Sequence, residues 1–156
     1  MLTIRRAQEK DTARIGELLT QVAKVHELGR PDIFKADTRK YTDEELVILL
    51  QDESRPIFVA VDDADEVVGY SFCVILEKGG HALKDMRTLY IDDLCVDASA
   101  RRLGVGKALF DYVKDYAREI GCYNLTLNVW ACNPGAMAFY EKLGMEMMKK
   151  EMETIL

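Results

Sequence analysis

The spacing of apolar residues predicts helices and strands that alternate along the chain. Residues 3–6 form a short strand, and Asp11 begins a helix whose apolar residues recur at helical spacing. Gly29 and Pro31 end that helix. Thr42 and Glu45 form a capping box, which predicts a second and shorter helix. The apolar positions of the first helix are Ile15, Leu18, Leu19, Val22 and Val25.

Later segments have the composition of strands. Residues 57–61 and 67–76 are expected to form a hairpin around the acidic turn 62–66, and residues 88–96 a central strand. Residues 124–131 carry no formal charge, which is typical of a strand covered on both faces. One further strand fits into residues 145–156.

Two helices follow the last two internal strands. The apolar face of a long helix begins at Val105 and ends near Ile120, with Gly121 as the C-terminal cap. A short helix has Asn133 as its N-cap and Pro134 at its first position, and it ends at Gly144. Because no linker or repeat interrupts this order, we expect one α/β domain over residues 1–156.

The turn between strand 88–96 and the long helix has the features of a phosphate-binding site. Its pattern is Arg101-x-x-Gly104-x-Gly106. The glycines let the backbone curl tightly and approach a ligand, and the first N–H groups of a helix have no partner within it. The helix dipole and the charges of Arg101 and Arg102 favour an anion there.

Two other nucleotide-binding motifs fit this turn less well. A GxxxxGK loop ending in Ser or Thr is excluded because Ala108 follows Lys107. A GxGxxG dinucleotide motif is weak, because Leu109 stands where the third glycine belongs. No acidic residue lies between Glu119 and Glu141 to bind a ribose.

The turn resembles the acyl-CoA pyrophosphate loop of the GNAT superfamily of N-acetyltransferases. The segment 133–144, NPGAMAFYEKLG, resembles the family segment in which an Asn caps a helix and a Tyr seven positions later faces the cofactor sulfur. There is also some likeness to polyamine and ribosomal-protein-type acetyltransferases. The resemblance implies a GNAT fold of class α/β (α+β), with a mixed, mostly antiparallel central sheet, two splayed parallel strands and flanking helices. It implies acetyl-CoA as co-substrate, bound by Leu94, Cys95, Val96, Arg101, Arg102, Leu103, Gly104, Val105, Gly106, Lys107, Asn133 and Tyr140.

The same resemblance implies roles in acetyl transfer from acetyl-CoA to a primary amine. A lysine-like amine has a pKa near 10.4, so removing its proton at pH 7 costs about 4 to 5 kcal/mol. Asp92 is expected to be the base or to hold the cation, and Asp93 to have a structural role near a bulge. Tyr140 is expected to supply a proton to the leaving thiolate. The backbone of residues 94–96 is expected to bind the pantetheine arm.

The net charge of the chain limits the kinds of acceptor molecule that are expected. The net charge of −6 argues against nucleic-acid binding and suits a cationic acceptor such as a polyamine, an amino sugar, or a protein lysine or N-terminus. No stretch approaches the roughly 20 apolar residues of a membrane span, so we expect a cytoplasmic protein. The cysteines lack the spacing of a metal site and are expected to be reduced and structural; they are Cys73, Cys95, Cys122 and Cys132.

Some residues keep open roles. Trp130 is expected either to contact the acceptor or to pack in the core, and the loop 27–41 to shape the acceptor pocket. His26 and His81 are interpreted as surface or loop residues. Because only one strand fits after Gly144, either the sheet is minimal or a partner subunit covers its edge, so a homodimer is a possible partner. The alternative function is a non-catalytic acyl-CoA-binding sensor or regulatory domain.

Overall fold

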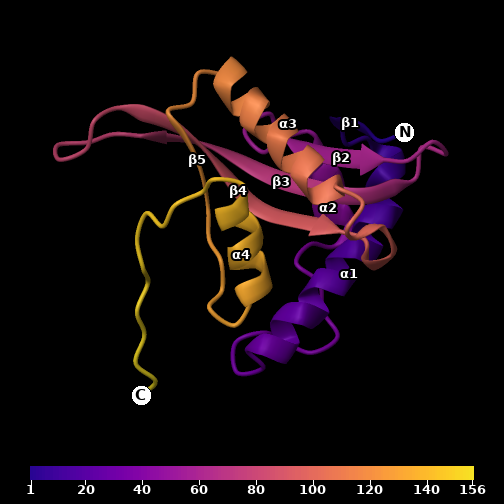
Figure 1. Cartoon of the computed structure of the whole chain (residues 1–156), viewed down its shortest axis with the longest axis horizontal. Coiled ribbons are helices and arrows are strands. Elements are labelled where there is room, and N and C mark those ends of the chain that lie inside the picture. Colours follow the sequence, from indigo (N-terminus) through magenta and orange to yellow (C-terminus); the bar gives the residue numbers. More distant parts are fainter.

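The centre of the computed structural model, which describes residues 1–156, is a five-stranded sheet in the order β1-β2-β3-β4-β5 (Figure 1). The first four strands are antiparallel neighbours, and β5 runs parallel to β4. The strands are Thr3–Arg6 (β1), Ile57–Val61 (β2), Val67–Lys78 (β3), Met86–Val96 (β4) and Asn124–Leu127 (β5). The expectation of a mostly antiparallel sheet with one parallel pair is confirmed.

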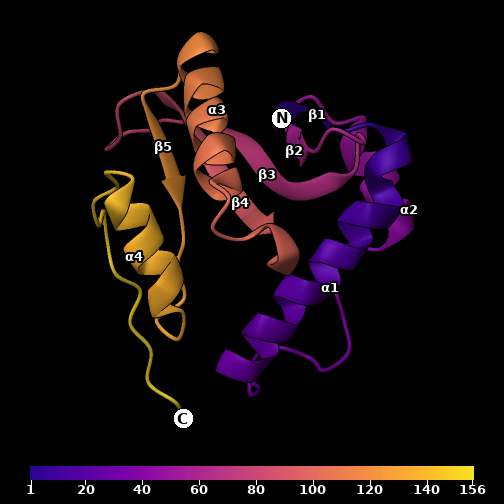
Figure 2. The same ribbon diagram turned by 45° about the vertical axis from the view of Figure 1, so that its right-hand side comes forward.

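Helices cover both faces of this sheet (Figures 1 and 2). Helices α1 and α2 pack on one face, whereas α3 packs on the other with α4 beside it. Short 3-10 turns precede α1 and α3, at Glu9–Asp11 and Ala98–Ala100. The helices are Thr12–Gly29 (α1), Asp43–Leu50 (α2), Val105–Glu119 (α3) and Pro134–Lys142 (α4).

Strand β2 explains how the two helical layers are held. All of its residues are buried, because successive side chains point to opposite faces and both faces are covered. Val59 packs in a cluster with Leu18 of α1 and Leu46 of α2. Its neighbour Phe58 packs in a second cluster with Phe110 of α3. The sheet is therefore sandwiched between two hydrophobic cores.

The helix ends agree with the capping signals except at the start of α1. Helix α1 ends at Gly29, and the Thr42 side chain accepts a hydrogen bond from the Glu45 N–H at 3.2 Å at the start of α2. Asp11 occupies the N-cap position of α1, but its side chain makes no capping bond. Its carboxylate is instead bound by the guanidinium of Arg5 and the N–H of Gln8.

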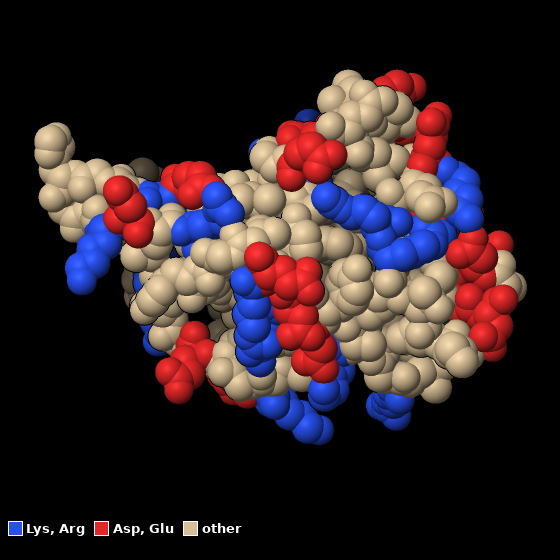
Figure 3. All heavy atoms as spheres, turned by 90° about the horizontal axis from the view of Figure 1, so that it is seen from above, with Lys and Arg blue, Asp and Glu red and all other residues tan.

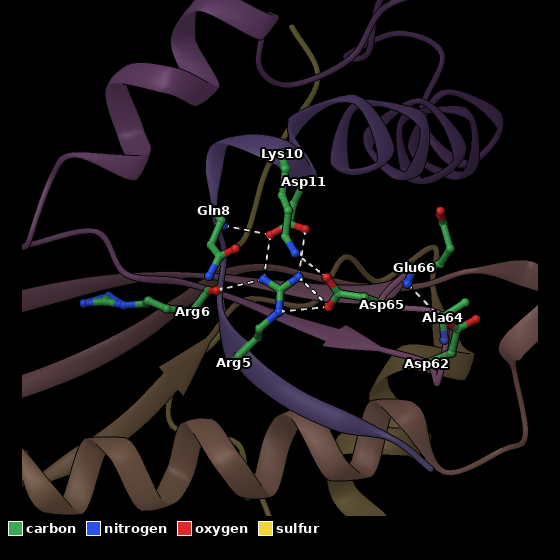
Figure 4. A network of polar contacts seen from close by, with 9 residues as sticks. All are labelled: Arg5, Arg6, Gln8, Lys10, Asp11, Asp62, Ala64, Asp65 and Glu66. Atoms are coloured by element: carbon green, nitrogen blue, oxygen red, sulfur yellow. Dashed lines mark hydrogen bonds and ion pairs between the residues drawn. The ribbon is translucent and has the colours of Figure 1, made fainter.

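The Arg5 guanidinium joins three segments of the chain (Figure 4). It donates to the carboxylate of Asp11 at 2.8 and 3.0 Å and to Asp65, in the β2–β3 turn, at 3.0 Å. Burial alone would raise the pKa of Asp11, but the bonds from Arg5 and Gln8 outweigh it and lower that pKa. The charged pair therefore fixes β1 and the start of α1 against the far end of the hairpin.

Strands β4 and β5 pair only from Thr88 to Ile91, against Asn124 to Leu127. The prediction of a strand over 124–131 is wrong in length, because beyond this point the two strands no longer pair. The residues of β5 are only half-buried, so the strand is also not covered on both faces. At the same point the register of β4 against β3 shifts and leaves Asp92 without a partner opposite. The backbone of residues 92–96 is consequently unpaired on the side of β5.

Residues 145–156 form no strand, contrary to the expectation that one fits there. The C-terminal ends of α3 and α4 agree with the prediction. Gly121 and Gly144 follow these helices with positive φ values of 77° and 91°. No helix has both the length and the apolar character needed to cross a membrane. On the face drawn in Figure 3, basic and acidic side chains lie interspersed rather than in separate areas.

Candidate active site

The turn before α3 presents a row of free hydrogen-bond donors. None of the backbone N–H groups from Arg101 to Lys107 donates a hydrogen bond within the protein. The turn contains two residues in the left-handed region, Arg102 with φ of 68° and Gly104 with φ of 79°. Such backbone curls N–H groups toward one side and, together with the N-terminus of a helix, favours an anion.

The two glycines of the turn are needed for different reasons. A side chain at Gly104 would meet no other atom, so only its positive φ favours glycine there. At Gly106 a Cβ would lie 3.0 Å from Phe139 of α4 and 3.5 Å from Val96 of β4. The missing side chain thus lets the start of α3 contact α4, which brings the two sequence motifs together.

The side chains of the turn divide into two groups. Arg101 and Arg102 are exposed and stand in no ion pair, whereas Lys107 pairs with Asp111 one turn further along α3. Asp97, at the end of β4, is buried and accepts hydrogen bonds from the N–H and hydroxyl of Ser99 at 3.0 and 3.1 Å. Asp97 therefore shapes the turn, and the two arginines are left to meet a ligand.

Helix α4 supplies the predicted tyrosine. The side chain of Asn133 accepts a hydrogen bond from the Ala136 N–H at 3.1 Å, which confirms its predicted role as a cap. Tyr140 lies two turns into the helix, half-buried against Phe139 and Phe110. Its hydroxyl makes no hydrogen bond within the protein. Because every buried polar side-chain atom has a hydrogen-bond partner, this hydroxyl is not buried and is accessible to solvent. Burial, assisted by the charge of Asp93, raises the pKa of Tyr140 to about 12.

The carboxylate of Asp92 is held by two residues from the loop before α2. The hydroxyl of Tyr41 donates to it at 2.8 Å, and the ammonium of Lys40 lies 2.9 Å from it. Burial and the bond to Asp92 raise the pKa of Tyr41, so the phenol stays protonated and keeps donating. The Asp92 carboxylate is thus paired with a primary ammonium, that of Lys40.

Asp93 points to a different partner from Asp92. The hydroxyl of Tyr70, which is fully buried, donates to its carboxylate at 2.9 Å. Desolvation by the surrounding protein raises the pKa of Asp93, although the bond from Tyr70 and the nearby charges of Lys40 and His26 oppose that rise. The charge of Asp93 also contributes to the raised pKa of Tyr140 on α4.

The strand end beyond the carboxylates offers backbone groups. Residues 94–96 have no partner on the side of β5, so their outward N–H and C=O groups are available to a chain laid along that edge. The side chain of Cys95 points away into the core, where burial raises the pKa of its thiol to about 12. The predicted contribution of Leu94, Cys95 and Val96 is therefore a backbone contribution.

An aromatic group joins the last turns of α1 to the loop that follows this helix and to Trp130. His26, in the last turns of α1, stacks on Phe34 with ring centroids 4.9 Å apart, and Phe34 meets the edge of Trp130 at 5.1 Å. Both histidines were interpreted as surface or loop residues: His81 is exposed in a loop, and His26 is partly exposed but belongs to helix α1. Trp130 packs on the loop 27–41 and not in either of the two main clusters.

Sequence reasoning missed the residues that contact the carboxylates. Lys40, Tyr41 and Tyr70 carried no motif, and the bond from Tyr41 to Asp92 spans 51 positions in the chain. The only signal was that the loop 27–41 was expected to shape a pocket. Surface hollows near Pro56 and near Tyr123 lie away from this site.

The arrangement combines three chemical capacities. The turn 101–107 can bind an anion, Asp92 can hold a cation, and the protonated phenol of Tyr140 on α4 can donate a hydrogen bond to a developing negative charge. Such a site fits a reaction between a phosphate-bearing ligand and an ammonium-bearing ligand.

Comparisons with known proteins agree on one family. A family model described as the acetyltransferase (GNAT) family matches residues 22–145. Peptidyl-lysine N-acetyltransferase YjaB of Salmonella typhimurium is 31% identical over 144 residues, covering 92% of this chain and 83% of that protein. Glucosamine 6-phosphate N-acetyltransferase of Arabidopsis thaliana is 26% identical over 109 residues, covering 70% of this chain and 64% of that protein. This chain thus spans less than two thirds of the length of that plant relative.

Solved structures extend the likeness to the whole fold. A crystal structure of a mutant of the BH1408 protein from Bacillus halodurans has a TM-score of 0.94 at 30% identity, with 99% of both chains covered. The crystal structure of glucosamine-6-phosphate N-acetyltransferase from Arabidopsis thaliana has a TM-score of 0.73 at 22% identity, which shows a shared fold.

Proposed function

The chain belongs to the acetyltransferase (GNAT) family, and on that premise we propose that it transfers an acetyl group from acetyl-CoA to a primary amine. Attack is direct, within a ternary complex of protein, acetyl-CoA and acceptor. The observation that carries this proposal is the contact of Gly106 with Phe139, which joins the free N–H groups of the turn to the helix of Tyr140.

The residues of the turn fit acetyl-CoA as a substrate. The N–H groups of residues 101–107, with the charges of Arg101 and Arg102, would hold the diphosphate. The unpaired backbone of residues 94–96 would bind the pantetheine arm in the manner of an added strand. Asn133 would border the thioester while capping α4.

The acceptor amine would take the place that the Lys40 ammonium has at Asp92. Lys40 is partly exposed and belongs to a loop, so an acceptor can displace it. The two relatives named above are described as acting on glucosamine 6-phosphate and on peptidyl-lysine, and both acceptors carry a primary amine. A lysine side chain matches the group already present at Asp92, while a polyamine-like molecule, an amino sugar or a protein N-terminus also carries the required ammonium.

The chemical step needs a neutral amine and a stabilised thiolate. The amine loses a proton to Asp92, directly or through water, and its lone pair attacks the thioester carbonyl carbon. A C–N bond forms and the C–S bond breaks, and the sulfur leaves with its electron pair. The nitrogen then loses its second proton to water or to the departing sulfur, which leaves a neutral amide. Tyr140 donates a hydrogen bond to that sulfur, and an N–H of residues 94–96 bonds the carbonyl oxygen while it carries negative charge.

The experiment is a thiol-release assay with acetyl-CoA and a panel of polyamines, amino sugars, peptides with lysine or a free N-terminus, and aminoglycoside antibiotics. Release that depends on one class of amine supports the proposal. Binding of acetyl-CoA without thiol release for any amine would instead favour a non-catalytic acyl-CoA-binding sensor. Thermal stabilisation of the protein by NAD or ATP but not by acetyl-CoA would contradict both the enzyme and the sensor.

A matched pair of glycine variants tests the acetyl-CoA site. Gly104 and Gly121 have φ values of 79° and 77°, and at neither position would a Cβ meet another atom. Alanine at either position therefore costs a similar strain, about 1 to 2 kcal/mol. Gly104→Ala should weaken acetyl-CoA binding, and Gly121→Ala should not. Equal affinity of the two variants for acetyl-CoA would mean that the diphosphate does not bind at this turn.

A further inference from the structure

The loop between α1 and α2, residues 30–42, runs back beside α1 and brings a lysine to the candidate site (Figure 2). The Nζ of Lys40 lies 2.9 Å from Oδ2 of Asp92 and 3.4 Å from the backbone oxygen of the same residue. Asp92 lies next to the point where β4 and β5 separate, since their pairing ends at Ile91. A primary amine of the protein itself therefore occupies the place where the acceptor amine is proposed to bind.

The residues on either side of Lys40 hold it in this place. Tyr41 donates to the same carboxylate oxygen of Asp92 at 2.8 Å and stacks on Phe72 of β3, with ring centroids 5.3 Å apart. On the other side, Arg39 forms an ion pair at 2.5 Å with the first residue of α2. Because both neighbours contact regular secondary structure, the ammonium is kept near the site, and a group held in this way has a high effective concentration.

The surroundings of Asp92 distinguish Lys40 from the other ion-paired lysines. Lys40 is the only lysine that pairs with a carboxylate of β4, whereas Lys10, for example, pairs with Asp65 in the β2–β3 turn. The unpaired backbone proposed to bind the pantetheine arm begins at Leu94, two residues beyond Asp92 on the same strand. That separation is about 7 Å, taking about 3.3 Å per residue. The Lys40 nitrogen is therefore close to the proposed position of the thioester.

We propose that Lys40 is a site of self-acetylation, at which the protein transfers the acetyl group of acetyl-CoA to its own lysine and thereby frees Asp92. This step rests on the proposed function, because it is the same reaction with an internal amine. The Lys40 ammonium gives one proton to Asp92, directly or through water, and its lone pair attacks the thioester carbonyl carbon. A C–N bond forms and the C–S bond breaks. The sulfur leaves with its electron pair and becomes a thiol with the second proton of the nitrogen.

The product of this step no longer forms the ion pair. Acetyl-lysine is a neutral amide, so it has no charge to pair with Asp92, and the carboxylate becomes available to the ammonium of an external acceptor. The reaction occurs only once on each chain, because the amide nitrogen is not a nucleophile. Acetyl-CoA alone thereby converts a protein whose acceptor site holds its own lysine into one whose site is open.

The test incubates the full chain with saturating acetyl-CoA and no other amine. The intact mass should rise by a single acetyl group, and peptide mapping should place that group on Lys40 and not on Lys10, which is also exposed and ion-paired. The rate constant should not depend on protein concentration, because the amine and the site belong to one molecule. Equal modification of the two lysines would indicate uncatalysed acetylation and overturn the proposal. A rate constant that rises in proportion to protein concentration would overturn it as well.

A pair of arginine variants provides the control. Lys40→Arg keeps a cation beside Asp92 but removes the nucleophilic amine, so acetylation should be lost. Lys10→Arg makes the same change at a lysine outside the site and should leave acetylation of Lys40 unchanged. Acetylated wild-type protein should have a KM for a cationic acceptor about two- to fivefold lower than before, because a partly exposed ion pair no longer competes for Asp92. An unchanged KM after complete acetylation would contradict the release of Asp92.

Thiol release with external amines separates this proposal from the proposed function. Release with an amine of the panel, while Lys40 stays unmodified, would overturn self-acetylation and leave the proposed function intact. Binding of acetyl-CoA with neither thiol release nor modification of Lys40 would overturn both.

Discussion

Replacing Tyr140 by phenylalanine tests how the leaving sulfur is stabilised. The pKa of this phenol is raised to about 12 by burial and by the charge of Asp93. An alkyl thiol has a pKa near 8.5, so full transfer of the phenolic proton to the thiolate is uphill by about 3 to 4 pKa units, or about 4 to 5 kcal/mol. Tyr140 therefore acts as a hydrogen-bond donor that stays protonated and does not become a phenolate.

The size of the effect follows from that role. A hydrogen bond to a charged group contributes about 1.5 to 3 kcal/mol, which converts to a fall in kcat of about 10- to 150-fold in Tyr140→Phe. The affinity for acetyl-CoA should change little, because the ring and its packing against Phe139 and Phe110 remain. The wild-type rate should also show no loss from ionisation of Tyr140 as the pH rises from about 7 to 10.

The assay is steady-state thiol release over this pH range, with acetyl-CoA affinity measured separately by titration. Tyr116→Phe is the control, because Tyr116 is also half-buried, packs against Phe58 at 5.0 Å and has a hydroxyl without a hydrogen-bond partner in the protein. A kcat of Tyr140→Phe within twofold of wild type would mean that the Tyr140 hydroxyl does not stabilise the leaving sulfur. A loss above about a thousandfold would mean that the proton is transferred and that the argument from the pKa is wrong.

Three further predictions concern the charged groups. Lys40→Met should lower KM for a cationic acceptor by about two- to fivefold, because it removes the ammonium that competes for Asp92. Asp92→Asn should raise this KM about tenfold or more. Steady-state kinetics measure both values, and an unchanged KM in both variants would mean that the acceptor does not bind at Asp92. Asp93→Asn should raise Tm at neutral pH, because the raised pKa of Asp93 means that its charged form destabilises the fold. This gain in Tm should vanish below about pH 4, where the carboxyl is protonated in both the folded and the unfolded protein. A lower Tm of the variant at pH 7 would contradict the prediction. Arg5→Met should cost about 2 to 4 kcal/mol of unfolding free energy, because it leaves the buried Asp11 carboxylate without its ion-pair partner and with only the Gln8 N–H as a hydrogen-bond donor. Because the pKa of Asp11 is lowered in the fold, that cost should be complete above about pH 5 and shrink on acidification; urea unfolding at several pH values tests this, and a pH-independent difference would contradict it.

Local signals in the sequence predicted the elements that position the site. The helix that starts after Gly104 and the cap formed by Asn133 depend on residues within a few positions of each other, and the structure has both. Strand β2 was predicted with its observed bounds, because a short apolar run between a proline and an acidic turn leaves few alternatives. Strand β5 was predicted too long, since its end is set by where it separates from β4 and not by its own residues.

The sequence by itself determined the turn of free N–H groups, the order of helices and strands, and two candidate residues of the reaction, Asp92 and Tyr140. Those depend on backbone conformation and on spacing along one segment. Only the tertiary structure decided that Lys40 and Tyr41 meet Asp92, that Tyr70 meets Asp93, and that residues 145–156 form no strand. These contacts join segments 23 to 52 residues apart, and no local pattern encodes which distant side chain the folding of the sheet will bring to a given carboxylate.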